Sequence, residues 1–272
     1  MSRNATMHHE LYDMLLDYAD LAVEVEAMNI GLNWTLCQAG TLGLAPTLPM
    51  TAGTPSWQGS LRGRHLGQLS HWLLDWDRSR ASVGLSAVNA ALNREADLVT
   101  ANGALFKGGA ALHHSIDWFA PLLRGKQVAQ IGPALAPLHL MEQQLDVHHF
   151  DCADGGLHPA CDSVLPECDW LFINARTIAD KTLPQILERA GDSRVVLYGA
   201  ALPWLDEWQQ FGIDYLLGCE VDSESELHTA VVEGQDVEQN AAALHFRLIN
   251  LQPELVVMPS STRPQLRTVA NG

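Results

Sequence analysis

The sequence predicts an α/β protein in which an α+β domain precedes a doubly wound parallel sheet. Short apolar runs alternate with helical patterns from residue 127 onward, as they do when helices join parallel strands. The clearest unit is 169–200, where the apolar run 170–173, a helical pattern and a second apolar run follow one another. Its first run is continuous rather than alternating, which indicates a strand covered by helices on both faces.

The first domain is expected to contain helices around a hairpin. A long stretch repeats apolar residues at helical steps, and two runs with period two follow it on either side of Gly40. Two further helical patterns come next, and a stretch with Gly-containing turns is expected to be a flexible loop. The elements of this half are a helix at 7–28, strands at 30–37 and 41–47, helices at 66–76 and 83–92, and the loop at 97–109.

The second domain is expected to alternate five strands with helices. The predicted strands lie at 128–131, 147–150, 170–173, 194–198 and 215–217, and the helices at 116–123, 134–144, 183–190, 204–210, 224–233 and 241–251. A short helix or loop is expected at 162–165. These patterns divide the chain into domains at 1–110 and 111–255 and a disordered tail at 256–272.

The polar segment between the strand at 170–173 and the next helix is the first candidate site. Thr182 and Gln185 have capping-box spacing, so the helix is expected to begin after Thr182 and to leave 174–181 as a loop. This loop follows the carboxyl end of a strand, where open α/β sheets bind ligands. Its charges and the helix N-terminus suit an anion, although ordinary turn chemistry accounts for the residues equally well. The candidates here are Asn174, Arg176, Thr177, Lys181 and Thr182.

The turn after the strand at 128–131 argues against a classical dinucleotide site. That fingerprint requires three glycines, and only Gly132 is present. Asp151 ends the next strand where an acidic residue would meet a ribose hydroxyl, so a smaller ligand at the same crevice stays open. Asn89 shares a helix face with Asn93, and a buried structural hydrogen bond is favoured there over a ligand contact.

Sulfur and imidazole side chains gather between residues 148 and 168. Cys152, His158 and Cys161 lie in a predicted loop and could converge on a divalent transition metal such as zinc, copper or nickel. Their spacing matches no CxxC or zinc-finger pattern, however. With 12 histidines in the chain, a chance cluster is the favoured alternative.

Composition excludes several classes of function. The formal net charge of −16 argues against binding nucleic acid or an anionic membrane. No apolar run reaches the roughly 20 residues that span a bilayer, and the N-terminus lacks a signal-peptide core, so a cytoplasmic protein is expected. The five cysteines are an odd number without a compact framework, which favours reduced thiols. The expected partner is a small molecule or metal ion, while assembly into a homo-oligomer stays open.

Six stretches carry a family resemblance: 33–35, 43–47, 83–90, 128–132, 169–187 and 212–218. In order and spacing they resemble the heavy-metal chelation proteins, which pair an enolase-N-terminal-like domain with a Rossmann-like domain. The resemblance covers roughly residues 10–250. It implies a site in the cleft between the two domains and brings Asn33 and Gly199 into the set of ligand-binding candidates.

The chain departs from the family at three turns. Segment 132–135 replaces a Gly-His-Phe-Pro-like turn, 174–178 replaces a Thr-Gly-Thr-Thr-Leu-like loop, and 199–201 replaces a Gly-Pro-Ser-like turn. Hydroxyl and imidazole donors are thereby lost. If the family holds its ligand through those donors, this chain is expected to bind something else or to bind through Arg176.

The leading hypothesis is a metal-handling protein that binds a heavy metal, a metal chelate or a chelator precursor in the cleft between its two domains. The alternative is an enzyme that holds a small cofactor or anionic substrate at the Rossmann-like crevice, through Arg176 and Lys181. A third hypothesis is a non-catalytic scaffold, because of the altered turns.

Overall fold

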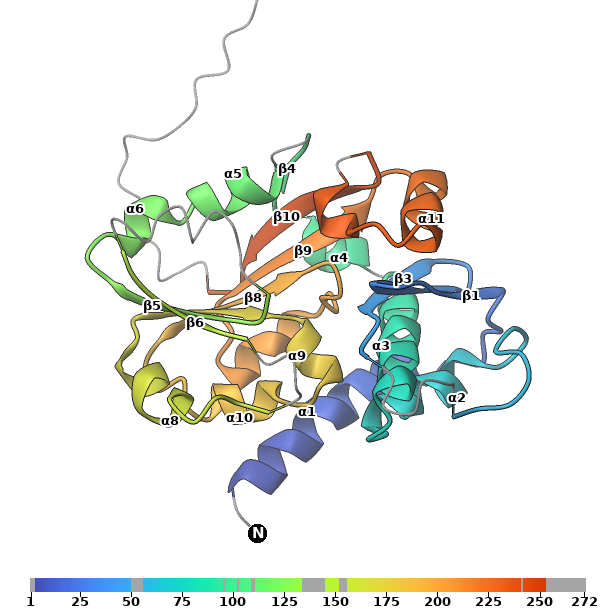
Figure 1. The fold of residues 1–272 in the computed structure, drawn as a ribbon, viewed down its shortest axis with the longest axis horizontal. Helices are drawn as coiled ribbons and strands as arrows, with labels where there is room; N and C mark the ends of the chain where they lie inside the picture. Colours follow the sequence, from blue (N-terminus) through green and yellow to red (C-terminus); the bar gives the residue numbers. More distant parts are fainter. Residues whose placement is uncertain are drawn as a thin grey trace, which may run out of the picture.

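The computed structural model describes residues 3–49, 56–94, 96–101, 103–108, 111–133, 145–151, 156–240 and 242–252. These residues form a three-stranded sheet and a seven-stranded sheet. The larger sheet runs through the middle of the molecule, and the smaller one lies to one side of it (Figure 1). This arrangement confirms a mixed α/β fold with a separate antiparallel unit. Within the described ranges, no helix has both the length and the apolar character needed to cross a membrane.

The three-stranded sheet is an antiparallel meander backed by a buried helix. Its strands pair in the order β1-β2-β3, and the β2–β3 pair confirms the predicted hairpin. Helix α3 packs against β3 and is buried on nearly every side, as expected of a helix inside a core. The elements of this half are α1 (Arg3–Ala19), β1 (Ala27–Ile30), β2 (Trp34–Gln38), β3 (Leu42–Pro46), α2 (Leu66–Ser70), η1 (His71–Leu74), α3 (Arg78–Leu92) and α4 (Ala96–Thr100).

The first helix is shorter than its sequence pattern predicts. It ends at Ala19, and the N–H of Val25 donates to the carbonyl of Arg64 (2.8 Å) instead of making a helical hydrogen bond. Leu21 and Val25 are four residues apart, a spacing that fits a helix, but it equally places both side chains on one face of an extended chain. The periodicity alone therefore could not mark where the helix ends.

The seven-stranded sheet has the order β4-β10-β9-β8-β7-β5-β6. Strands β5 to β9 are parallel to one another, and in chain order they follow the flavodoxin-like arrangement 2-1-3-4-5. The order reverses between β5 and β7, which is where such sheets bind ligands. The strands are β4 (Ala104–Phe106), β5 (Gln127–Ile131), β6 (Asp146–Phe150), β7 (Trp170–Asn174), β8 (Arg194–Gly199), β9 (Tyr215–Val221) and β10 (Leu244–Asn250).

Helices cover both faces of this sheet, which explains why its central strands are continuously apolar. In Figure 1, α5 and α6 lie on one face, and α8 and α10 lie on the other. Leu171 and Ile173 join one apolar cluster, while Phe172 and Val196 join a second cluster on the opposite face. The remaining helices are α5 (Ala111–Asp117), α6 (Ala120–Leu123), α8 (Cys161–Val164), η2 (Leu165–Glu167), α9 (Arg176–Ala179), α10 (Leu183–Leu187), η3 (Asp206–Phe211), α11 (Glu224–Val232) and η4 (Val237–Gln239). The predicted helix at 134–144 and the predicted tail at 256–272 lie outside the described residues.

Two predictions near the outer strands were wrong. The predicted helix at 241–251 is strand β10, which pairs antiparallel with β9 and with β4. The predicted loop at 97–109 contains α4 and β4. Because β4 joins the large sheet, that sheet begins before residue 110. The domain boundary at 110 stays a prediction.

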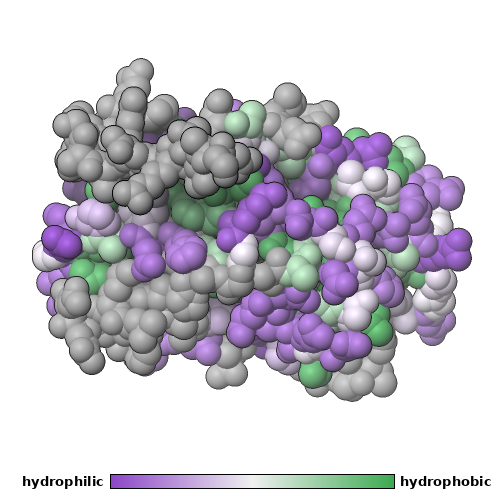
Figure 2. All heavy atoms as spheres, turned by 90° about the horizontal axis from the view of Figure 1, so that it is seen from above, coloured by the Kyte–Doolittle hydropathy of each residue, from purple (hydrophilic) through white to green (hydrophobic). Residues whose placement is uncertain are grey.

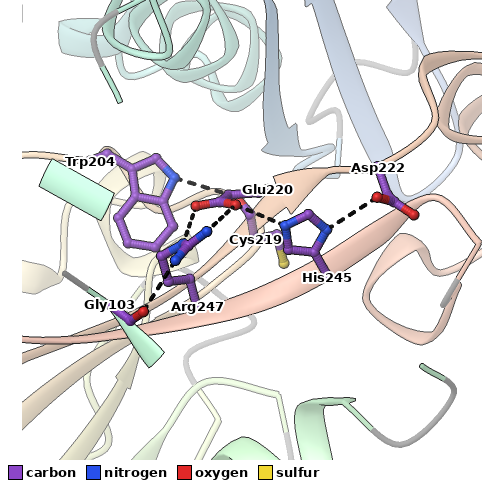
Figure 3. Close-up of polar contacts among 7 residues, drawn as sticks. All are labelled: Gly103, Trp204, Cys219, Glu220, Asp222, His245 and Arg247. Atoms are coloured by element: carbon purple, nitrogen blue, oxygen red, sulfur yellow. Dashed lines mark hydrogen bonds and ion pairs between the residues drawn. The ribbon is translucent and has the colours of Figure 1, made fainter. Parts of the chain in front are cut away.

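A polar cluster fastens β4, β9 and β10 together (Figure 3). Arg247 on β10 binds both oxygens of Glu220 on β9 and also donates to the carbonyl of Gly103 (3.1 Å). His245 shares the Glu220 carboxylate, with 2.8 Å between Nε2 and Oε2. These side chains are largely buried, so their charges compensate one another inside the fold.

Hydrophilic residues make up much of one face of the molecule (Figure 2). Figure 2 shows a face on which hydrophilic residues predominate among the described atoms, with apolar residues in smaller groups between them.

Candidate binding cleft at the carboxyl ends of the parallel strands

A cavity of about 270 Å³ lies between the β2–β3 hairpin and the carboxyl ends of β5 and β7. It therefore coincides with the point where the strand order of the large sheet reverses. Both halves of the chain contribute to its walls. The nine described residues that line it are Asn33, Trp34, Pro46, Thr47, Pro133, Asn174, Arg176, Asp236 and Glu238.

Asn174 lines the cavity, and two glycines leave room for its side chain. Gly132 and Gly199 have φ values of +114° and +121°, which side chains rarely adopt. A Cβ on Gly132 would lie 2.6 Å from Asn174 Cβ, and one on Gly199 would lie 3.2 Å from Asn174 Nδ2. The structure thus gives these two predicted site residues a steric role beside Asn174.

The chain turns sharply after Asn174 and aims Arg176 at the cavity. Asn174 Oδ1 accepts from the N–H of Arg176 (2.8 Å), and Thr177 Oγ1 donates to the carbonyl of Asn174 (2.7 Å). These bonds start the short helix α9 in the segment 174–181 that was predicted to be a loop. Thr177 therefore supports the turn from a buried position and does not line the cavity.

Arg176 has hydrogen-bonding capacity that the described residues do not use. Its Nε atom is buried and has no hydrogen-bond partner among them. Asp180 interacts electrostatically with Arg176, and burial raises the pKa of that carboxyl against the effect of this charge. A guanidinium in this state suits a carboxylate or phosphate ligand, which can accept two parallel hydrogen bonds.

Glu238 and Asp236 bring negative charge to the same cavity from η4. Glu238 Oε1 accepts from the N–H of Ala200 (2.8 Å), just beyond β8. Burial, helped by the nearby charge of Asp236, raises the pKa of Glu238 to about 7 against the effect of this hydrogen bond. Glu238 can therefore gain or lose a proton near neutral pH. Neither carboxylate was predicted from the sequence, because no spacing links η4 to the strand ends that it joins.

Asn33 closes the opposite wall. Its Nδ2 donates to the carbonyl of Gly234 (2.8 Å), which ties the turn before β2 to the segment leading into η4. Thr47 lies beside it in the lining, and its hydroxyl shares a hydrogen bond with Thr35 (2.9 Å). Three of the predicted ligand-binding residues, Asn33, Asn174 and Arg176, thus meet at one cavity.

The other predicted ligand-binding residues lie outside this lining. Asn89 Nδ2 donates to the carbonyls of Leu44 (2.6 Å) and Ala201 (2.9 Å), so its amide joins the two halves of the chain.

Thr182 precedes α10 without capping it, because its hydroxyl donates to Asp180 instead; the predicted capping box was wrong. Lys181 is buried with φ +66°, and burial lowers its pKa to about 8. Asp151 is exposed after β6.

The predicted metal ligands are only partly described. Cys161 is buried in the core, and burial raises the pKa of its thiol, whereas His158 is exposed and accepts from the N–H of Ala160 (3.2 Å). Cys152 lies outside the described residues, so the three-residue metal site stays a prediction. Among the residues that the structure does describe, no three His, Cys, Asp or Glu side chains are grouped to hold a metal ion.

Comparison with known proteins identifies the fold and the family. A protein of unknown function from Desulfitobacterium hafniense, from the DUF364 family, superposes with a TM-score of 0.74 at 22% identity, covering 89% of this chain and 98% of that one. A DUF364 protein of unknown function from Pyrococcus horikoshii gives a TM-score of 0.71 at 18% identity, with coverages of 90% and 99%. The search of curated proteins found no match.

Two family models match the sequence itself. The DUF364 model covers residues 115–250, and the DUF4213 model covers residues 12–92; each is described as "Putative heavy-metal chelation". The first match alone spans half of the chain. The chain therefore belongs to the DUF364 family, whose description is "Putative heavy-metal chelation".

Proposed function

We propose that this protein binds a small organic chelator, or the complex of that chelator with a heavy metal, in the cleft between its two sheets. The family description supports a role connected with heavy metals. The lining of the cleft supports contact through the organic part of the ligand. The carboxylate of the chelator pairs with Arg176, and the amides of Asn33 and Asn174 bind its other polar groups.

The observation that carries this proposal is the chemistry of the cavity wall. The nine described lining residues include an arginine, two amides, a hydroxyl and two carboxylates, but neither cysteine nor histidine. Soft metals prefer thiolate and imidazole ligands, which the described part of this wall does not supply. A chelator brings its own metal ligands, so the protein needs only to recognise a charged organic molecule.

Calorimetry with diglycolate tests the proposal, because this ether dicarboxylate chelates metals and carries no amine. We expect diglycolate and its Ni²⁺ complex to bind more tightly than Ni²⁺ alone. Arg176→Ala should weaken the binding of diglycolate by about 10- to 100-fold, since hydrogen bonds to charged groups contribute about 1.5–3 kcal/mol. Arg189→Ala is the matched control, because Arg189 pairs with Asp162 on the surface, outside the cleft lining. Unchanged affinity in Arg176→Ala, or tighter binding of the bare ion, would refute the proposal.

A further inference from the structure

Glu238 and Arg176 line the same cavity, and both retain binding capacity that the described residues do not use. Glu238 Oε1 accepts from the Ala200 N–H, but neither a hydrogen bond to Oε2 nor an ion pair with a cation is found within the described ranges. Asp236 differs, because its oxygens accept from the N–H of Glu238 (3.2 Å) and from Gln239 Nε2 (2.9 Å). The cavity therefore offers its ligand one cation with an unused hydrogen-bond donor and one open carboxyl group.

This pair of groups selects a ligand with two opposite charges. A purely anionic ligand would pair with Arg176 but would be repelled by Glu238. A purely cationic ligand would pair with Glu238 but would be repelled by Arg176. We propose that the ligand is an amino-carboxylate chelator, whose carboxylate pairs with Arg176 and whose protonated amine donates to Glu238. This inference rests on the function proposed above.

Among the described residues around Glu238, none provides an alternative partner for its charge. Asp236 is negative, and burial raises the pKa values of the Tyr198 hydroxyl and the Cys219 thiol, so both remain neutral. Arg176 is the one cation among the described lining residues. An ammonium group that enters the cavity would thus supply the missing positive charge beside Glu238.

Binding of the amine is expected to release the proton of the Glu238 carboxyl group. In the free protein Glu238 titrates at about pH 7, so near that pH a large fraction of the molecules carry the protonated carboxyl. An ammonium group stabilises the carboxylate and lowers its pKa. The proton of the carboxyl then passes to the buffer, while the amine keeps its own proton and donates it in the new hydrogen bond.

A matched pair of probes tests the amine directly. Iminodiacetate and diglycolate differ only in the central group, which is an amine in the first and an ether oxygen in the second. We expect the protein to bind iminodiacetate at least about tenfold more tightly, because a charge-assisted hydrogen bond replaces a carboxylate–ether contact. Glu238→Gln should remove this preference without weakening the binding of diglycolate, because it removes a carboxylate that repels this dianion. Glu224→Gln, on the exposed face of α11, is the control and should keep the preference.

A second measurement needs no variant. Calorimetry of iminodiacetate binding at pH 6.5, in two buffers with different ionisation enthalpies, should show the net release of protons. Equal affinity for the two probes, a preference that survives in Glu238→Gln, or proton uptake would each overturn the amine contact. Diglycolate binding that still depends on Arg176 would leave the proposed function standing in those cases, whereas loss of that dependence would remove the proposed function itself.

Discussion

Replacement of Gly132 by alanine tests how room is made for Asn174 in the cavity lining. The added Cβ would lie 2.6 Å from Asn174 Cβ, whereas carbon atoms normally pack about 3.5–4.0 Å apart, so the two strand ends must separate by about 1 Å. Such overpacking costs about 1–3 kcal/mol. The backbone at φ +114° adds strain of about 1–3 kcal/mol. We therefore expect Gly132→Ala to reduce the free energy of unfolding by about 2–6 kcal/mol, measured by urea denaturation.

Two companion variants separate these contributions. Gly125 has φ +69°, and a Cβ added there would meet no heavy atom within 4 Å, so Gly125→Ala should cost only the backbone strain of about 1–2 kcal/mol. Asn174→Gly removes the atom that the new Cβ on residue 132 would meet. The double variant of Gly132→Ala and Asn174→Gly should then lose less free energy of unfolding than the sum of the losses in the two single variants, by at least about 1 kcal/mol. Additivity within about 0.5 kcal/mol would refute the steric account of Asn174.

Three further predictions concern groups away from the cavity lining. Asn89→Leu should destabilise the protein by about 1–3 kcal/mol in urea denaturation, because it leaves the carbonyls that Asn89 bonds without that donor. Glu220→Gln should cost stability at pH 7. Burial alone would raise the pKa of Glu220, but hydrogen bonds from Arg247 and His245 hold it below 4.5, so the difference from the parent should disappear as the pH falls through that lowered pKa. Burial raises the pKa of Cys37 to about 12, so mass spectrometry should find this thiol unalkylated by iodoacetamide at pH 8 until the protein is denatured.

The parallel part of the fold was predictable because each of its strands is covered on both faces. A continuous apolar run as short as 170–173, bounded by polar residues, is typical of a buried strand in a parallel sheet, and β7 occupies it. β10 was not predictable in the same way. Its sequence, LHFRLIN, places apolar residues at the first, third, fifth and sixth positions, which fits both a strand and one face of a helix. Only its pairing with β9 and β4 decides between them.

The candidate site was partly predictable for a reason of topology. Asn174 and Arg176 follow the strand at which the sheet order reverses, and polar residues in that position face a crevice whatever lies across it. Glu238 could not be found in this way. It reaches the cavity from η4, and its high pKa depends on burial against chain segments far from it in the sequence. The steric role of Gly132 likewise depends on a contact with β7 that the turn sequence does not contain.

The apolar core that passes between the two halves of the chain determines how a ligand can enter. Leu36 and Val88 from the first half belong to the same buried cluster as Ile178 and Leu197 from the second. Moving the two halves apart would expose this apolar surface to water, which costs a free energy of about 25 cal/mol for each Å² exposed. The walls of the cleft are therefore held at a fixed separation, and we expect association and dissociation to proceed without hinge closure, so that affinity reflects the fit of the ligand to a site already assembled.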